Sequence, residues 1–382
     1  MSPIQHLRKN SCPQLFRSFF SINPYIPGYF LMKGRVEQLD GLRGIFSVLV
    51  VAHHHNAVKD SIFYNNFFVI NSDLFVDFFF VLSGFVIAMN YNTRINSAPD
   101  FFDFLKKRII RLYPLLVFTE LVFLIFNVIG DHSSLKNFSM DSMYYFRTVT
   151  DTLTFMGSTP IFGDWIGLNY PSWSISAEMI AYIVYGLVIV LMLRYRYLAF
   201  TIITIICIGF MIWKGQYILA YDYGFVRGIL CFGIGVFTHA LCSRMNLNLS
   251  FAEFPYLALL VGAMYYTHHW QLNLGKLMFP FLFSLGIIVY ANSTGIITRL
   301  LSSRPMQYLG KISYSIYLNH AIVLILMNVV LFRFFKLPTS EPMVLLSLIA
   351  SIVFTVIYSH FTYHFIELKV GNFFRKNRTI VQ

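Results

Sequence analysis

An arginine and a histidine lie near opposite ends of the first long apolar segment of this chain. Arg43 belongs to the run Leu-Asp-Gly-Leu-Arg-Gly over residues 39–44, and His54 is the second of three consecutive histidines. Eleven residues are almost three turns of an α-helix, so the two side chains share one face and lie about 16 Å apart along the axis. In a membrane-spanning helix, this spacing predicts Arg43 at a water interface and His54 near the midplane, where ionisable side chains are usually functional.

A second explanation of this pair needs no chemistry. Arg43 would anchor the helix at the membrane surface, and the three histidines would form an interfacial belt at its far end. Because successive helical residues point about 100° apart, only His54 of the three shares the face of Arg43. The same geometry argues against one metal site built from all three histidines.

Four basic residues precede the third apolar segment, in Lys106-Lys107-Arg108-Ile-Ile-Arg111-Leu-Tyr-Pro114. Arg108 and Arg111 are three residues apart and share a helical face, which suits a bidentate grip on phosphate. A basic collar beside a membrane span explains them equally well. Pro114 is predicted to open the next helix.

Three carboxylates lie inside otherwise apolar segments. Asp73 and Asp77 are spaced i, i+4 on one face of the second segment, where one is expected to orient an imidazole or to pair with a buried cation. Glu178 lies one turn inside a segment that opens with Trp173, an aromatic residue typical of the membrane interface.

Further candidates lie in the second segment and near the end of the chain. Ser83-Gly84 favours close packing between helices, although the serine could also contact a ligand. His320 lies about two turns into a late apolar helix, where hydrogen-bonded packing competes with catalysis as an explanation. Glu367 follows the last apolar segment.

The composition requires elements that cross a membrane. Of the 382 residues, 57% are hydrophobic and 12% are charged, and soluble domains carry about twice that charged fraction. We expect an all-α polytopic bundle of about ten spans, because only helices or closed barrels satisfy the backbone in lipid. The predicted spans are 44–58, 67–90, 114–130, 174–193, 197–213, 224–241, 255–267, 277–291, 312–332 and 342–365.

Basic residues are distributed unequally between the two sides of these spans. With a cytoplasmic N-terminus, 21 of the 29 Lys and Arg residues face the cytoplasm. The positive-inside rule therefore predicts both termini in the cytoplasm, and it explains the net charge of +12 without a nucleic-acid partner. The weaker apolar stretch 144–157 is predicted as a re-entrant or interfacial helix. The expected divisions are a cytoplasmic segment 1–37, a transmembrane domain 38–367 and a cytoplasmic tail 368–382.

Taken in their order along the chain, these motifs resemble those of the membrane acyltransferase-3 family, whose members acylate sugars and other acceptors. The resemblance extends from about residue 38 to residue 367. It rests on Leu-Asp-Gly-Leu-Arg43-Gly with His54, Phe-Phe-Val-Leu-Ser83-Gly-Phe, Arg108-x-x-Arg111-x-x-Pro114, Trp173-Ser-Ile-Ser-x-Glu178, Ser313-Tyr-Ser-Ile-Tyr-Leu-x-His320 and Phe365-Ile-Glu367.

The chain departs from the family pattern at three positions. Met179 stands where the family often has a second acidic residue, Asn319 stands where it often has an aromatic residue, and no proline closely follows Glu367. The pair of Arg43 and His54 is unaffected. Many relatives also carry a soluble C-terminal hydrolase-like domain, which we do not expect here.

The resemblance implies an integral-membrane O-acyltransferase of the cytoplasmic, or inner, membrane. Its donor would be acyl-CoA, most often acetyl-CoA, and its acceptor a hydroxyl of a polysaccharide or lipid-linked sugar at the outer face. Arg43, Arg108 and Arg111 would bind the donor from the cytoplasmic side, together with Ser83. No metal is expected.

In the implied reaction, His54 is the general base, and Asp73 or Asp77 holds its tautomer. Glu178 would position the acceptor from the outer side. A transporter or flippase with midplane charges is the alternative function. No inverted repeat is visible in the sequence, and clustered cytoplasmic arginines suit the phosphates of CoA better than a small solute.

Overall fold

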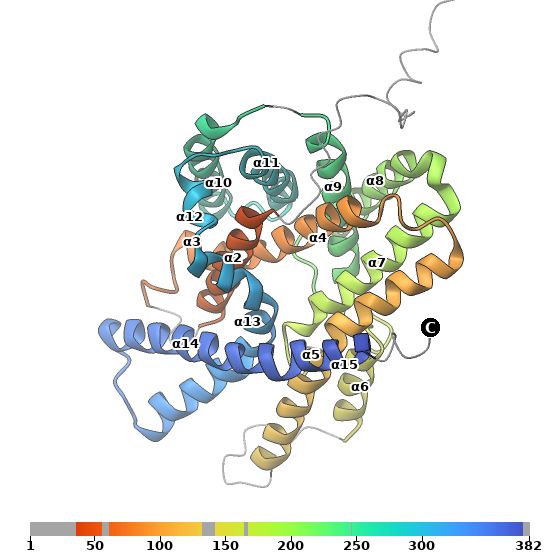
Figure 1. The fold of residues 1–382 in the computed structure, drawn as a ribbon. Helices are drawn as coiled ribbons and strands as arrows, with labels where there is room; N and C mark the ends of the chain where they lie inside the picture. Colours follow the sequence, from red (N-terminus) through yellow and green to blue (C-terminus); the bar gives the residue numbers. More distant parts are fainter. Residues whose placement is uncertain (1–35, 56–60, 132–141, 164–166, 246, 377–382) are drawn as a thin grey trace, which may run out of the picture.

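The computed structural model describes residues 36–55, 61–131, 142–163, 167–245 and 247–376, and their regular structure is entirely helical (Figure 1). Almost all of the predicted N-terminal segment 1–37 and the end of the predicted tail lie outside the described residues. The helices are α2 (Glu37–His54), α3 (Phe67–Ile70), α4 (Phe75–Tyr91), α5 (Ala98–Asp131), α6 (Ser142–Leu153), α7 (Ser172–Met192), α8 (Arg196–Lys214), α9 (Gly224–Cys242), α10 (Glu253–His269), α11 (Phe279–Ala291), α12 (Ile296–Leu301), α13 (Arg304–Asn328), α14 (Glu341–Thr362) and α15 (Lys369–Lys376). Short 3₁₀ turns are η1 (Asn71–Leu74), η2 (Leu193–Tyr195), η3 (Ser250–Ala252) and η4 (Leu274–Met278), and the π-helical turns are η5 (Val329–Phe334) and η6 (Tyr363–Leu368).

Seven helical stretches among the described residues are long and apolar enough to cross a membrane, as expected for an all-α integral-membrane protein. One of them, Ser172–Lys214, contains α7 and α8 and therefore two of the predicted spans. Helices α2 and α10 overlap two further predicted spans but are not among the seven. The number of crossings and the side of each terminus stay predictions.

Two predicted helix boundaries were wrong. Helix α5 runs without a break from Ala98 to Asp131, with Pro114 in its interior rather than at a helix start. Membrane helices tolerate such a proline because neighbouring groups satisfy the freed carbonyl. Helix α2 ends at His54, so it stops at the histidines instead of continuing to residue 58.

Glycines let α2 pack closely against α13 and α12. A Cβ at Gly41 would lie 2.2 Å from the carbonyl oxygen of Leu301, and one at Gly44 would lie 2.7 Å from the backbone nitrogen of Gly310. Gly310 in turn lies against the backbone of Asp40. The glycines on either side of Arg43 therefore belong to the helix interface, in the way that small residues do in membrane bundles.

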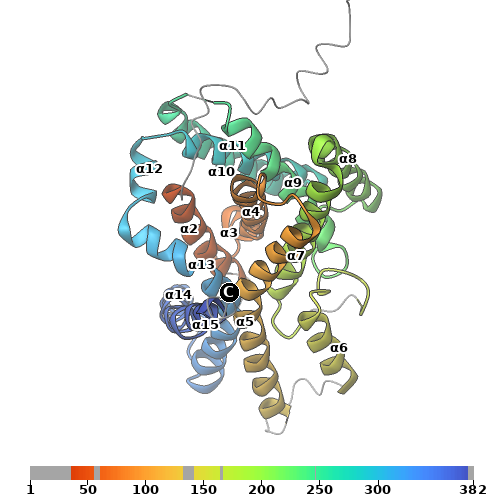
Figure 2. The same cartoon turned by 45° about the vertical axis from the view of Figure 1, so that its right-hand side comes forward.

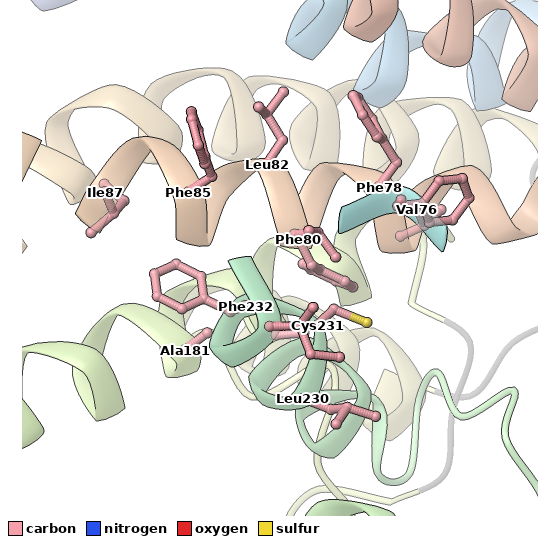
Figure 3. Packing of buried hydrophobic residues seen from close by; sticks show 14 of the residues in the cluster. Val76, Phe78, Phe80, Leu82, Phe85, Ile87, Ala181, Leu230, Cys231 and Phe232 are labelled. Carbon is pink, nitrogen blue, oxygen red and sulfur yellow. The ribbon is translucent and has the colours of Figure 1, made fainter. Parts of the chain in front are cut away.

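A second close crossing joins α4 to α9. A Cβ at Gly84 would meet the carbonyl oxygen of Phe232 at 2.1 Å, and one at Gly235 would meet that of Val81 at 2.0 Å. Figure 3 shows the apolar side chains around this crossing, with Phe80 of α4 facing Cys231 and Phe232 of α9. The prediction that Ser83-Gly84 marks a packing point between helices is confirmed for the glycine.

Helix α14 contacts α13 through small polar residues. Ser347, Ser351, Thr355, Ser359 and Thr362 recur every three or four residues and are all buried. The N-terminal part of α5 lies beside α7, and its C-terminal part projects from the bundle together with α6 in both views (Figures 1 and 2). Helix α6 overlaps the stretch predicted as re-entrant or interfacial and is not one of the seven candidate spans.

Candidate active site

A cavity of about 900 Å³ lies beside the N-terminal half of α2. Three arginines from two helices line it, namely Arg43 of α2 and Arg108 and Arg111 of α5. Lys107 and Lys311 add two further cations to its wall. The close packing of α2 and the register of α5 thus bring the predicted phosphate-binding residues to one space, whose acidic members are Asp40 and Glu367.

The guanidinium of Arg108 is held by aromatic neighbours. Its Nη2 donates a hydrogen bond to the hydroxyl of Tyr91 at 2.9 Å, and its Cζ lies 5.2 Å from the centroid of that ring. The rings of Phe104 and Tyr182 lie 5.7 and 6.0 Å away. Its buried Nε has no hydrogen-bond partner among the described residues. The planar group is therefore held in place while its buried Nε–H stays free to donate, a state that favours an anionic ligand.

The guanidinium of Arg43 is held by fewer contacts than that of Arg108. Its Nη1 lies 3.5 Å from Oδ1 of Asp40 on the same helix, and its side chain is 26% exposed. Arg111 lies close enough to Glu178 and Glu367 for both carboxylates to act on its charge. The basic side of the cavity is therefore partly balanced by acidic groups, and it still carries more cations than carboxylates.

A smaller cavity of about 100 Å³ shares the three arginines and extends from them to Ser174 and Tyr317. Glu178 lines it and accepts a hydrogen bond from the Ser83 hydroxyl at 2.6 Å. The hydroxyl of Tyr182 also donates to Glu178. Glu178 and Ser83 therefore belong to the space that holds the arginines, whereas the sequence predicted Glu178 on the side of the acceptor.

Tyr317 forms the boundary between this cavity and His320. Its ring lines the small cavity, beside Phe79 at a centroid distance of 5.9 Å. On the other side, the rings of Tyr317 and His320 are 5.8 Å apart, and the Tyr317 carbonyl accepts from Nδ1 of His320 at 2.6 Å. One residue of α13 thus contacts both the arginine-lined space and the histidines.

His54 and His320 form a hydrogen-bonded pair, in which Nδ1 of His54 lies 3.3 Å from Nε2 of His320. Nδ1 of His54 also lies 3.0 Å from the carbonyl oxygen of Val50. A carbonyl only accepts, so the hydrogen-bond partners assign a proton to Nδ1 of both imidazoles. His320 therefore presents the lone pair of its Nε2 to His54, and the lone pair of His54 lies on its own Nε2.

The three consecutive histidines contact three different elements. Nδ1 of His53 lies 2.9 Å from the carbonyl oxygen of Val69 in α3, and Nε2 of His55 lies 2.9 Å from the hydroxyl of Ser347 in α14. Of the three, only His54 lies against His320, and the ring of Tyr170 lies tilted beside His54 with the ring centroids 4.8 Å apart. The helical argument that singled out His54 agrees with this arrangement.

The two acidic residues of the second predicted span, Asp73 and Asp77, lie beside Arg227 of α9. Asp77 is buried and accepts from Nε of Arg227 and from the hydroxyl of Tyr217, at 2.6 and 2.7 Å. The Asp73 carbonyl accepts from Arg227 at 3.4 Å. Asp77 therefore pairs with a buried cation, which was one of its two predicted partners, and its carboxylate oxygens are not bonded to His54.

Trp173 belongs to the same ion-pair region. Its ring lies 5.6 Å from Cζ of Arg227, and a Cβ at Gly224 would meet its edge at 2.7 Å. Glu367 accepts from the Ser315 hydroxyl at 3.1 Å in the wall of the large cavity. Glu367 thus lies with the three arginines of the large cavity, and Trp173 lies beside the buried ion pair of Arg227 and Asp77.

Sequence reasoning missed several residues of this region. Tyr182 follows Glu178 by four positions and could have been found as its partner on one helical face. Arg227 is a charge within a predicted span, which is itself a signal for a specific partner. Tyr317 lies three residues before His320 on the same helix, so helical spacing could also have found it. Tyr91 and Tyr170 have no such local signal, because their neighbours come from other helices.

The chain matches the model of the acyltransferase-3 family, described as an acyltransferase domain, over residues 36–363. A relative from Bacillus subtilis (strain 168), named "Putative peptidoglycan O-acetyltransferase YrhL", is 26% identical over 383 residues, which cover 90% of this chain and 54% of the relative. The chain thus spans about half the length of that relative. "Protein 2 in picA locus" from Rhizobium radiobacter is 30% identical over 166 residues, or 39% of this chain and 79% of the relative. No solved structure matches the chain.

Proposed function

Because the chain belongs to the membrane acyltransferase-3 family, we propose that it transfers an acyl group, most simply acetyl, from cytoplasmic acyl-CoA to a hydroxyl of a glycan or lipid-linked sugar at the outer face. One observation carries this proposal. The arginine-lined space ends at Tyr317, which also contacts His320, the hydrogen-bond partner of His54. The space proposed for the donor and the histidine proposed as the base are therefore separated by the side chains of Tyr317 and His320.

The donor would occupy both cavities. CoA is a polyanion, and Arg43, Arg108 and Arg111 supply guanidinium groups that suit its phosphates. The narrower cavity, which shares these arginines and reaches Ser174, suits the pantetheine arm and its thioester. Glu178 would hold Ser83 and Tyr182 along this path and offset part of the arginine charge.

His54 would act as the general base. Its Nε2 takes the proton of the acceptor hydroxyl as the oxygen attacks the thioester carbonyl, and the C–S bond then breaks. The proton passes from the imidazolium to the departing sulfur, so the products are the ester and CoA-SH. His320 would stabilise the imidazolium, since its Nε2 lone pair accepts the Nδ1–H of His54. This replaces the orienting role predicted for Asp73 or Asp77.

The test is release of free thiol from acetyl-CoA by the purified protein in lipid vesicles, with and without acceptor. Suitable acceptors are glycan strands of peptidoglycan, chosen from the name of the Bacillus relative, and the β-1,4-linked tetramer of N-acetylglucosamine. We expect thiol release that depends on acceptor and base-labile acetyl groups on the glycan. Movement of a sugar across the vesicle without acetyl-CoA, and no thiol release, would instead support a transporter.

A further inference from the structure

Four buried oxygen atoms on three neighbouring residues have no hydrogen-bond partner within the part of the chain that the structure describes. Both carboxylate oxygens of Glu120, Oδ1 of Asp151 and Oδ1 of Asn169 are unpartnered. The three residues are 3%, 6% and 0% exposed. Unsatisfied buried acceptors are costly and call for an explanation, because native proteins pair nearly all of them.

These residues come from three segments that meet between the bundle and α6. Glu120 is on α5, Asp151 is on α6, and Asn169 lies in the connection before α7. The Thr152 hydroxyl and the Asn169 backbone N–H approach the Glu120 carboxyl, and the Asp151 charge acts on it, but neither donor reaches it with the geometry of an ordinary hydrogen bond. Among the groups that act on it in the described part of the chain, none is a cation.

Two hydrogen bonds from the side-chain nitrogen of Asn169 fix the orientation of its amide group. Its Nδ2 donates to the Thr119 hydroxyl at 3.1 Å and to the Leu318 carbonyl at 3.2 Å. These two bonds hold the nitrogen toward α5 and α13, so the unpartnered oxygen of Asn169 points away from them. Since Thr119 directly precedes Glu120, the bonds also tie Asn169 to the helix that carries this carboxylate.

The cluster is next to the proposed base. Asn169 precedes Tyr170, whose ring lies 4.8 Å from that of His54 and 5.6 Å from that of His320. Leu318, the other anchor of Asn169, is two residues from His320 on α13. The side-chain oxygen of Asn169 therefore belongs to the residue directly before a ring in contact with His54, and Glu120 follows the residue that Asn169 bonds.

We propose that Glu120, Asp151 and Asn169 form the subsite that binds the hydroxyl-rich acceptor and presents one hydroxyl to His54. The inference rests on the proposed acyl transfer. Carboxylate and amide oxygens accept from hydroxyl and N-acetyl N–H groups, so a sugar supplies the donors that the chain does not. Tyr170 would supply an aromatic face beside the bound sugar. A site built this way rejects analogues that lack one hydroxyl, because a buried acceptor is then left unpaired.

The experiment compares Glu120→Gln and Asp151→Asn with the intact protein in vesicles. The acceptor is the N-acetylglucosamine tetramer or the peptidoglycan strand on which the intact protein is active. We expect KM for the acceptor to rise about 10- to 100-fold in either variant, with kcat at saturating acceptor changed much less. Binding of CoA should be unchanged. Asp100→Asn is the matched control, since this carboxylate lies on the same helix and caps its exposed start.

A deoxy-sugar series sharpens the test. The intact protein should lose activity on one monodeoxy analogue of the accepted sugar, and Glu120→Gln should show little further loss on that analogue. Acceptor kinetics equal to those of the intact protein would overturn the inference while the acyltransferase activity stands.

Two other results would also overturn the proposal of an acceptor subsite. A parallel loss of CoA binding and of thermal stability would mean a structural role. Loss of activity in EDTA that Ca²⁺ or Mg²⁺ restores would mean that the oxygens hold a cation. Absence of thiol release from the intact protein with every acceptor would instead overturn the proposed function, and this subsite with it.

Discussion

At the scale of single residues, the three histidines at the end of α2 differ only in what each contacts. His54 lies against His320, while His53 and His55 make hydrogen bonds to α3 and α14. A neutral imidazole with one fixed proton can offer its other nitrogen as a base. The choice of the proposed general base therefore depends on which of the three histidines faces α13.

Replacing His54 by alanine should lower the rate of acyl transfer by about 10²- to 10⁴-fold, the usual effect of losing a general base. The measurement is acceptor-dependent thiol release at saturating acetyl-CoA. His53→Ala and His55→Ala are the controls and should keep much of their activity. Near-normal turnover of His54→Ala, or loss only in one of the controls, would contradict the assignment of the base.

Arg108 tests whether guanidinium geometry matters at the donor site. Arg108→Lys keeps the charge but loses the planar group that lies over Tyr91 and bonds its hydroxyl. We expect weaker binding of CoA, with part of the loss hidden at low ionic strength, where long-range attraction is less screened. Isothermal titration calorimetry with CoA at two salt concentrations measures both the affinity and its dependence on salt. Unchanged affinity in Arg43→Ala, Arg108→Ala and Arg111→Ala would show that these residues are topological anchors alone.

At the scale of elements, α2 is held by close backbone contacts as much as by side chains. Its glycines lie against the backbones of α12 and α13, so the positions of Arg43 and His54 depend on one interface. Displacement of this helix would move the proposed donor site and the proposed base together. The glycines of the Leu-Asp-Gly-Leu-Arg-Gly motif thus have a structural role beside the donor-binding role proposed for its arginine.

Gly44→Ala tests this interface. The added Cβ would lie 2.6 Å from Cβ of Leu309 and 2.7 Å from the backbone nitrogen of Gly310, so α2 must shift. Overpacking of this kind typically costs about 1–3 kcal/mol. We expect a lower unfolding temperature together with losses of both CoA binding and transfer. Gly262→Ala is the control, because nothing lies within 4 Å of its Cβ position, and equal behaviour of the two variants would contradict this account.

Glu253 links α10 to the start of α12. It is 1% exposed and accepts from the Ser293 hydroxyl at 2.6 Å and from the backbone N–H groups of Ile297 and Thr298 at 2.9 and 3.1 Å. Burial alone would raise its pKa, but these hydrogen bonds outweigh burial and hold the pKa of Glu253 below its ordinary value. Its ionised form therefore stabilises the folded state.

This stabilisation should be present above about pH 4.3, the ordinary pKa of glutamate, and be lost as the pH falls through the lower folded-state pKa. Glu253→Gln leaves buried donors without a charged acceptor, so the folded state should lose about 1–3 kcal/mol at pH 7. Thermal unfolding in detergent at pH 7 and below pH 4 measures both effects. The difference in unfolding temperature between the two proteins should shrink at the lower pH, and a constant difference would contradict this role.

At the scale of the whole molecule, the arginine-lined cavity and the histidine pair lie at opposite ends of α2. A donor from one side of the membrane and an acceptor from the other could then meet inside the bundle. This arrangement requires that the end of α2 with Arg43 faces the cytoplasm, as the distribution of Lys and Arg predicts.

A reporter fused after Gln382 should therefore behave as cytoplasmic, and one inserted within 131–143 should behave as external. Alkaline phosphatase and green fluorescent protein fusions read the two compartments. Fusions after residue 246, in a loop predicted to be cytoplasmic, are a further check on the number of crossings. External behaviour at the C-terminus would reverse the topology and with it the sides assigned to donor and acceptor.

The sequence by itself determined the class of protein and the helical architecture, and it selected Arg43 and His54 as the residues proposed for the chemistry. Hydrophobic segments must be helical in lipid, and helical periodicity alone puts His54 of the three histidines on the face of Arg43. The paired arginines of α5 were predicted from a three-residue spacing. These properties are local, so they can be derived from residues that are close along the chain.

Only the tertiary structure decided which groups become partners across helices. Asp77 pairs with Arg227, 150 residues away, and His54 pairs with His320, 266 residues away. Glu178 joins the arginines, and the unpartnered oxygens of Glu120, Asp151 and Asn169 gather from three segments. No spacing within one segment specifies such contacts, because they depend on how the glycine-lined faces of separate helices pack.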